Sequence, residues 1–181
     1  MKKLKLKFPI FFLLFGILLG CAQYNKNADV EADIAAIKEV LGTYILGVNN
    51  DDLDLFISAW CDDAIRMESG YPAIIGKEII RAHFKKIGFD NFNCNIDLYG
   101  EIEVEVSGDL AFSHANYILS ITPKEGGSTT LFDGKVVDIY KRQADGSWKI
   151  YIDSPNSNPT WSNDTLSPGM LEKQNPYDPK F

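Results

Sequence analysis

The sequence is poor in the residues that most often hold metal ions, with only three cysteines and two histidines among 181 residues. They show no spacing typical of a metal site, so the sequence predicts neither a metal nor another cofactor. Its 8 prolines and 14 glycines are too few for a low-complexity or collagen-like chain. With 45% apolar residues, the length fits one globular domain followed by a tail.

Basic residues are scarce over most of the chain. Four of the 18 lysines and arginines lie in residues 1–20, which contain no acidic residue. The rest of the chain therefore holds 14 basic residues against 25 acidic residues. Such an acidic surface repels a phosphate backbone, so we exclude nucleic acid as a partner. It also disfavours anionic small ligands unless a local arginine or lysine offsets the charge.

The longest apolar run, Ile10–Leu19, follows a basic start and is too short for a spanning helix, which needs about 20 residues. This arrangement predicts a signal peptide over residues 1–20. The run ends in Leu18-Leu19-Gly20-Cys21, which resembles a bacterial lipobox. The resemblance implies cleavage before Cys21 and a lipid such as palmitate on its thiol, which would make the membrane a partner of this lipoprotein.

A lipidated Cys21 would make residues 21–28 a short tether and would anchor the protein in the cell envelope. Ala22, in place of an aspartate after the cysteine, favours the outer membrane in a Gram-negative cell. Two alternatives stay open: a signal peptide in which the cysteine is incidental, and an uncleaved anchor.

The other two cysteines, Cys61 and Cys94, allow two states in an exported protein. The compartment permits a disulfide, which would stabilise the fold by about 3–4 kcal/mol. Cys94, however, lies on the apolar face of a predicted strand, where a free buried thiol is the commoner state. The sequence therefore favours free thiols and leaves the disulfide open.

Apolar residues recur at steps of three and four in the first part of the domain, which predicts three helices. Asparagine and aspartate residues between positions 49 and 52 separate the first two, because these residues end one helix and cap the next. The predicted helices cover Asp29–Asn49, Leu53–Trp60 and Gly76–Ile87.

The pattern changes to period two after Gly88, which predicts antiparallel strands joined by glycine-containing turns. Gly134, inside one of these strands, is expected to bend the sheet as a bulge. A short strand, Ala64–Glu68, precedes the third helix. The later strands are predicted at Phe92–Leu98, Glu101–Val106, Leu110–Thr122, Thr129–Arg142 and Trp148–Ser154.

Helices followed by a long antiparallel meander predict the α+β class. The expected architecture is a strongly curved antiparallel sheet with three helices on its concave face, which leaves a cone-shaped pocket. This domain spans residues 29–156. Residues 157–181 are rich in proline and lack apolar periodicity, so we expect an extended C-terminal tail.

The motifs in this domain resemble the SnoaL-like, DUF4440 branch of the nuclear-transport-factor-2-like (NTF2-like) superfamily. The resemblance covers about residues 30–156. It implies a cone-shaped fold and names no single function, because the superfamily includes isomerases, dehydratases, hydrolases and proteins without chemistry. The motifs are Tyr44-x4-Asn49-x2-Asp52-Leu53-Asp54, Trp60-x-Asp62-Asp63-Ala64, Gly76-x3-Ile80-Arg81, and Tyr140-Lys141-Arg142 followed by Trp148-Lys149-Ile150 and Asp153.

A comparison with the ketosteroid isomerases of this superfamily supplies candidate catalytic residues. In those enzymes a tyrosine and a protonated aspartate donate hydrogen bonds to a developing oxyanion, and a carboxylate moves the proton. The resemblance implies that Tyr44 and Asp138 are the donors and Glu68 the base, with His83 facing the pocket. Glu68 departs from the family's aspartate by one methylene, which shifts the carboxylate by roughly an ångström.

The leading interpretation is a membrane-tethered domain whose pocket binds a small, mostly apolar molecule, with no assigned chemistry. Tyr44, Phe56, Trp60 and Phe84 would supply the pocket walls, together with His83. One alternative is a proton-transfer enzyme of the ketosteroid isomerase type, and another is a non-catalytic structural lipoprotein whose pocket is filled by side chains. His114 adds a further alternative, because two histidines near one pocket acid would resemble the dehydratases of the superfamily.

Each polar candidate also has a purely structural interpretation. Tyr44 would be a core tyrosine whose hydroxyl finds a partner. Glu68 would form a local ion pair with Arg66, worth at most about 1 kcal/mol. Asp138 would be a solvated acid if its strand face points outward, and a buried carboxyl with a raised pKa if it points into the pocket.

The open face of the sheet predicts assembly. Leu110–Thr122 carries apolar residues on both faces, although the helices of one chain cover only one face. Members of the resembled family usually pair through the open face. We therefore expect a homodimer.

Overall fold

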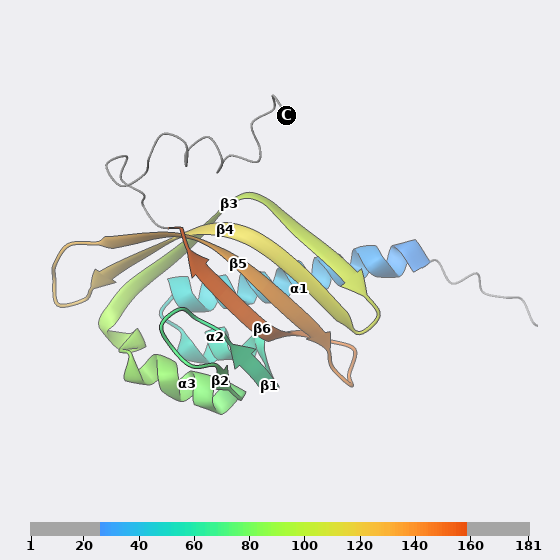
Figure 1. The fold of residues 1–181 in the computed structure, drawn as a ribbon, viewed down its shortest axis with the longest axis horizontal. Helices are drawn as coiled ribbons and strands as arrows, with labels where there is room; N and C mark the ends of the chain where they lie inside the picture. Colours follow the sequence, from blue (N-terminus) through green and yellow to red (C-terminus); the bar gives the residue numbers. More distant parts are fainter. Residues whose placement is uncertain (1–25, 159–181) are drawn as a thin grey trace, which may run out of the picture.

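The computed structural model describes residues 26–158, with helices packed on one face of a curved sheet (Figure 1). The predicted signal peptide, the lipidation site Cys21 and the segment 159–181 lie outside the described residues. The helices are α1 (Lys26–Asn49), α2 (Leu53–Ser58), α3 (Lys77–Lys86) and the short 3-10 turn η1 (Phe89–Asn91). The strands are β1 (Trp60–Arg66), β2 (Ile74–Ile75), β3 (Phe92–Ser107), β4 (Leu110–Pro123), β5 (Thr130–Arg142) and β6 (Trp148–Ser157).

The six strands form one sheet in the order β2-β1-β6-β5-β4-β3. Strands β3 to β6 make the predicted antiparallel meander. The expectation of a wholly antiparallel sheet is wrong in one place, because β1 runs parallel to β6. The chain between β1 and β6 contains α3 and the whole meander, so β1 can join the edge of β6 in the same direction.

The sheet has three register irregularities, one of them between Trp60 and Ile65 where β1 pairs with β6, and none lies at Gly134. A second register shift separates Tyr99 from Glu103, so the two strands predicted on either side of Gly100 form one bent strand, β3. The third falls between Ile139 and Tyr140, where β5 pairs with β6. The register runs without a break through Gly134, so the predicted bulge there is wrong.

The second helix is shorter than predicted. It ends at Ser58, and Trp60 already belongs to β1, where it pairs with Ile150 of β6. The backbone N–H of Ile150 donates to the carbonyl of Ala59 at 2.9 Å. An aromatic residue such as Trp60 fits a buried strand as well as a helix. The pairing of Trp60 with β6 therefore determines where α2 ends and β1 begins.

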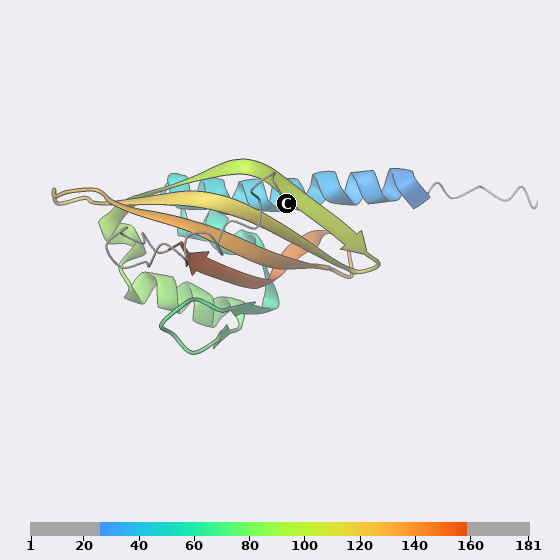
Figure 2. The same cartoon turned by 45° about the horizontal axis from the view of Figure 1, so that its top comes forward.

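The helices α1, α2 and α3 lie on the concave face of the sheet, as Figures 1 and 2 show from two directions. Side chains from these helices and from the inner faces of the strands form one buried core. Asn49 fixes the end of α1 to the edge strand β3: its Nδ2 donates to the Ile96 carbonyl at 3.2 Å, and its Oδ1 accepts from the Ile96 N–H at 2.7 Å. This side chain pairs the edge backbone that no neighbouring strand covers.

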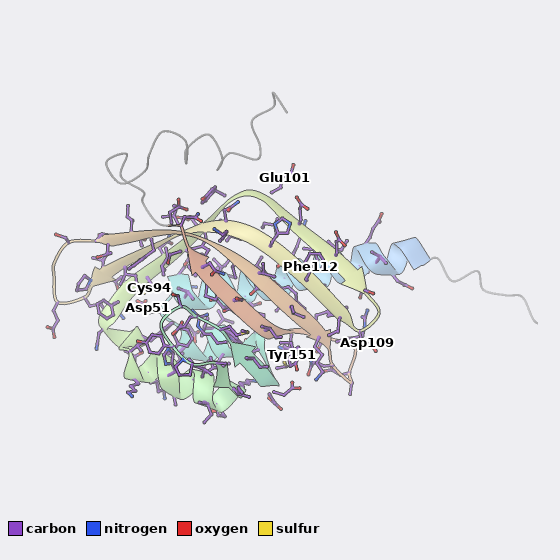
Figure 3. All side chains as sticks on the ribbon, in the orientation of Figure 1. Asp51, Cys94, Glu101, Asp109, Phe112 and Tyr151 are labelled. Carbon is purple, nitrogen blue, oxygen red and sulfur yellow. The ribbon has the colours of Figure 1, made fainter. Side chains whose placement is uncertain are left out.

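Among the described residues, Cys61 and Cys94 are both free thiols, as the sequence favours. Cys61 is buried and donates a hydrogen bond from its Sγ to the Ile150 carbonyl at 3.1 Å. Figure 3 labels Cys94, which is half-buried on β3, and Phe112, which is exposed on the outer face of β4. No helix between residues 26 and 158 is long and apolar enough to cross a membrane.

Candidate functional site

Three neighbouring cavities lie between the helices and the concave face, and Arg66 and Leu119 line all of them. The inner cavity has a volume of about 70 Å³ and contains the buried acidic side chains Asp138 and Asp153. The apolar chamber, of about 300 Å³, lies beside α2, α3 and β3. The vestibule, of about 390 Å³, is bordered by Glu68, Tyr71 and Phe132, among others. Arg66 therefore stands where the three cavities meet.

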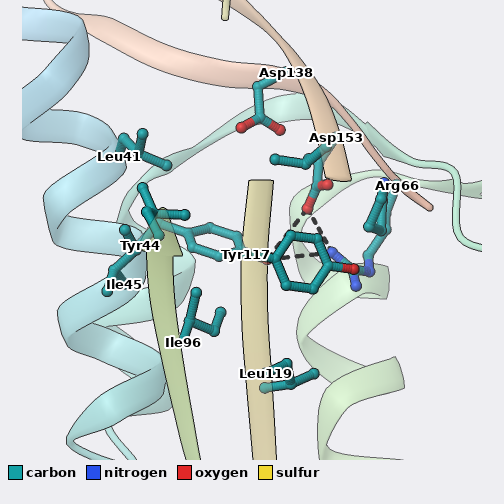
Figure 4. A pocket seen from close by; sticks show the side chains of 12 residues that line it. Leu41, Tyr44, Ile45, Arg66, Ile96, Tyr117, Leu119, Asp138 and Asp153 are labelled. Atoms are coloured by element: carbon teal, nitrogen blue, oxygen red, sulfur yellow. Dashed lines mark hydrogen bonds and ion pairs between the residues drawn. The ribbon is translucent and has the colours of Figure 1, made fainter. Parts of the chain in front are cut away.

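The inner cavity brings polar side chains together from four elements (Figure 4). Asp138 of β5 and Asp153 of β6 are direct cross-strand partners on the concave face. The Nη1 of Arg66 donates to Asp153 Oδ2 at 2.5 Å, and the hydroxyl of Tyr44 donates to the same oxygen at 3.4 Å. The hydroxyl of Tyr140 donates to Asp138 Oδ2 at 3.4 Å. Of these two buried carboxyls, only Asp153 contacts the guanidinium of Arg66.

Burial controls the titration of these groups. It raises the pKa of Asp138 well above its ordinary value, and the neighbouring Asp153 raises it further. Burial also raises the pKa of Asp153, but Arg66 offsets part of that effect. The pKa of Tyr44 is raised by burial and then by Asp153, so its hydroxyl keeps its proton. Asp138 therefore keeps its proton to a higher pH than Asp153, which has Arg66 as a partner.

Glu68 lies on the other side of Arg66. Its Oε2 accepts from Arg66 Nε at 2.7 Å, and its Oε1 is 2.8 Å from His83 Nε2 of α3. Glu68 lines the apolar chamber and the vestibule, Asp138 lines the inner cavity, and Tyr44 lines both the inner cavity and the apolar chamber. Of the predicted catalytic residues, the fold brings Tyr44 and Asp138 to one cavity and connects Glu68 to them through Arg66.

The predicted wall residues divide between cavity and core. Tyr44, Phe56 and Phe84 line the apolar chamber, and the Phe56 and Phe84 rings pack edge to face with centroids 4.7 Å apart. Trp60 is completely buried in the core, with its ring centroid 5.7 Å from that of Phe56. His83 does not itself line any of the three cavities. It contacts two residues that line the chamber, Glu68 and Phe84, with the His83 and Phe84 ring centroids 5.6 Å apart.

His114 lies on the outer face of the sheet, where its side chain is half exposed and 3.3 Å from Glu103. It is the cross-strand partner of Val137, one position away from the concave-face pair Ser113 and Asp138. The alternative with two pocket histidines is therefore wrong, because successive residues of a strand point to opposite faces.

Arg66 and Tyr117 are the site residues that the sequence reasoning did not assign to the pocket. Arg66 does make the predicted ion pair with Glu68, but it also holds Asp153 and is itself buried. Arg66 lies two residues after the buried Ala64 in β1, so the two side chains point to the same face of the sheet. That alternation is the signal that could have revealed Arg66 as a buried residue. Tyr117 gives no such signal, because its role depends on Gly134 in the neighbouring strand.

Comparisons with known proteins agree with the fold. A family model described as a SnoaL-like domain matches residues 30–151. No curated protein sequence matches this chain. A ketosteroid isomerase-like protein from Erwinia carotovora atroseptica superposes with a TM-score of 0.60, at 23% identity, covering 70% of this chain and 98% of the other.

Two further structures extend this comparison. A scytalone dehydratase-like protein from Novosphingobium aromaticivorans gives a TM-score of 0.64 at 13% identity, covering 71% of this chain and 86% of the other. An NTF2-like superfamily protein from Salmonella enterica gives 0.65 at 12% identity, covering 76% of this chain and 99% of the other. At these identities the structures establish the fold alone, whereas the family match spans most of the domain. The chain therefore belongs to the SnoaL-like domain family and has the NTF2-like fold.

Proposed function

We propose that this domain binds a small, mostly apolar molecule and that a lipid on Cys21 tethers it to a membrane. The observation that carries the binding proposal is the apolar chamber of about 300 Å³, which opens toward a buried polar cluster. Its lining is almost wholly aromatic and aliphatic, as is usual for small-molecule sites. The lining includes Phe56, Phe84, Phe89, Cys94, Ile96 and Ile121.

The polar cluster favours a neutral polar group on this ligand. Asp138, Asp153 and Glu68 surround the one guanidinium of Arg66, and Arg66 already contacts Asp153 and Glu68. An anionic group placed there would lie beside carboxyls without a spare cation among the described residues. This agrees with the acidic charge of the chain beyond residue 20.

Binding is better supported than proton transfer by Glu68. A general base has to take up the substrate proton and carry it through the reaction. The Glu68 carboxylate pairs with the buried Arg66, so a proton taken up by Glu68 would remove a negative charge that balances this guanidinium. Tyr44 and Asp138 both line the inner cavity, so a reaction of the isomerase type stays a second candidate.

Filling the cavity tests the binding proposal. Leu119 lines all three cavities, whereas Leu131 is exposed at the neighbouring position of the same hairpin. We expect the native protein, purified from its own membranes, to carry a small apolar molecule detectable by mass spectrometry of an organic extract. Leu119→Trp should remove that molecule, and the control Leu131→Trp should retain it. Identical extracts from the two variants would contradict the proposal.

Mass analysis of the N-terminal peptide tests the tether. We expect the mature protein to begin at Cys21 with a diacyl or triacyl modification, since a single acyl chain gives only marginal anchoring. Cys21→Ala should leave the precursor uncleaved and free of lipid. An unmodified Cys21 in the wild-type mature protein would overturn the tether and leave the binding proposal intact.

A further inference from the structure

Tyr117 of β4 separates the inner cavity from the vestibule. It lines both of these cavities and does not line the apolar chamber. Figure 4 shows its ring beside Arg66 and Asp153 in the inner cavity. A ligand body in the apolar chamber reaches the inner cavity past Tyr44, Ile96 and Leu119, which line both, and the Tyr117 ring then forms the far wall that limits the room for its head group.

The Tyr117 ring packs against Gly134 of β5. Gly134 is the cross-strand partner of Tyr117, and a Cβ built on it would overlap the Cζ atom of the ring. The same Cβ would lie 2.5 Å from the Tyr117 Oη and 2.8 Å from the Asn156 carbonyl oxygen. Gly134 does not have a positive φ, so glycine is required here for space and not for backbone conformation. Any side chain at position 134 would push the ring toward the cavities.

Packing on Gly134 determines where the ring lies. Among residues 26–158, no group makes a hydrogen bond with the Tyr117 hydroxyl. The inner cavity that the ring leaves has a volume of about 70 Å³, against about 390 Å³ for the vestibule on the other side of the ring. The inner cavity therefore favours a small head group.

We propose that Tyr117, which packs against Gly134, sets the size limit for the ligand head group that reaches Asp138 and Asp153. The ligand is then an apolar body held in the chamber with a small neutral head group, such as a hydroxyl, in the inner cavity. This inference rests on the proposed binding function. It makes Tyr117 a specificity-determining residue and Gly134 a positioning residue that acts only through it.

A matched pair of ligands tests the size limit. The probes are 3-phenylpropan-1-ol and its isopropyl ether, which share a skeleton and differ in the bulk of the head. Cys94 lines the chamber, so a bound phenyl group should slow its alkylation by iodoacetamide. Cys61 is fully buried and reports unfolding in the same mass spectrum. The full chain is measured in lipid nanodiscs, and each ligand is compared between variants so that partition into lipid cancels.

In the wild type we expect the alcohol to protect Cys94 at a concentration about tenfold or more below that of the ether. Tyr117→Ala should bring the two concentrations within about twofold, because the ring that limits the size of the inner cavity is gone. Gly134→Ala should weaken protection by the alcohol about tenfold. The double variant should behave like Tyr117→Ala, because Gly134 acts through the ring.

The outcomes separate this inference from the function on which it rests. If neither probe protects Cys94 in the wild type, the binding function fails. If both probes protect the wild type and the variants leave their ratio unchanged, binding stands and the role of Tyr117 is overturned. If Cys61 reacts in Gly134→Ala, showing that this variant unfolds, Tyr117→Leu and Tyr117→Ala still decide the matter by the same ratio.

Discussion

Asp138 and Asp153 are the same residue type, face each other across two strands, and behave differently. Asp153 accepts from Arg66 and Tyr44, which stabilise its ionised form. Asp138 accepts only from Tyr140 among the described residues, and the adjacent Asp153 disfavours a second negative charge. The position of one guanidinium therefore makes Asp138 the more readily protonated of the two carboxyls.

The same substitution at these two positions should have opposite consequences. An asparagine resembles a protonated aspartate, so Asp138→Asn should fold normally. Because the folded-state pKa of Asp138 is raised, wild-type stability falls as pH rises above the unfolded value of 3.8. Relative to Asp138→Asn, the loss has a slope of up to about 1.4 kcal/mol per pH unit until the folded-state pKa is passed.

Asp153→Asn should instead cost about 3 kcal/mol or more near neutral pH, because it removes a partner of the buried Arg66. Urea unfolding of both variants and the wild type at a series of pH values checks both expectations. A pH-independent difference between the wild type and Asp138→Asn would show that Asp138 is ionised in the folded state.

Single site residues were predictable where the family register supplied them. The resemblance to the ketosteroid isomerases supplied Tyr44 and Asp138, and both line the inner cavity. The position of Glu68 could not be settled this way. The Glu68 carboxylate is held by the buried Arg66. Arg66 in turn bonds to Asp153, which lies 87 residues away in the sequence. Contacts of that separation leave no trace in local periodicity.

At the scale of elements, α1 and α2 pack at very short range. Gly47 of α1 faces the backbone of Phe56 in α2, and a Cβ at Gly47 would overlap the Phe56 nitrogen and lie 2.5 Å from its Cα. Gly42, five residues earlier in the same helix, has no neighbouring heavy atom within 4 Å of such a Cβ. One helix thus contains a glycine that packing requires and another that it does not.

Two alanine substitutions in α1 should therefore change stability in opposite directions. Gly42→Ala should stabilise the domain by about 0.5–1 kcal/mol, because alanine is the better helix former. Gly47→Ala should destabilise it by about 1–3 kcal/mol or more, since the backbone of Phe56 has to shift. Chemical unfolding of the two variants measures both changes. Equal effects of the two substitutions would show that α1 and α2 are not in contact at Gly47.

Elements were predictable from the sequence where local pattern and tertiary pairing agree. The predicted α1 and α3 and the meander from β3 to β6 are confirmed, because periodicity and turn residues mark them clearly. The start of β1 was missed because Trp60 continues the apolar pattern of α2 while its backbone joins β6. The bend of the sheet was misplaced because Gly134 serves the packing of Tyr117.

On the scale of the whole molecule, the helices cover one face of the sheet and leave the other open (Figures 1 and 2). Leu110, Phe112 and Val137 are exposed large apolar residues on that outer face. Glu103 and Glu105 lie beside them on β3 and give the face a charged border. An apolar centre with a polar rim is the usual composition of an interface between protein chains.

We expect two copies of the chain to pair through this outer face. Phe112→Lys places a charge at its centre, so it should dissociate the pair while leaving the concave core unchanged. Ile79→Lys is the matched control, because Ile79 is similarly exposed but lies on α3, on the opposite side of the sheet. Sedimentation of a form beginning at Ala22, at micromolar concentration, should give a dimer for the wild type and Ile79→Lys and a monomer for Phe112→Lys. A monomeric wild type would mean that the outer face is exposed to solvent, and a dimer that survives Phe112→Lys would place the interface on another surface.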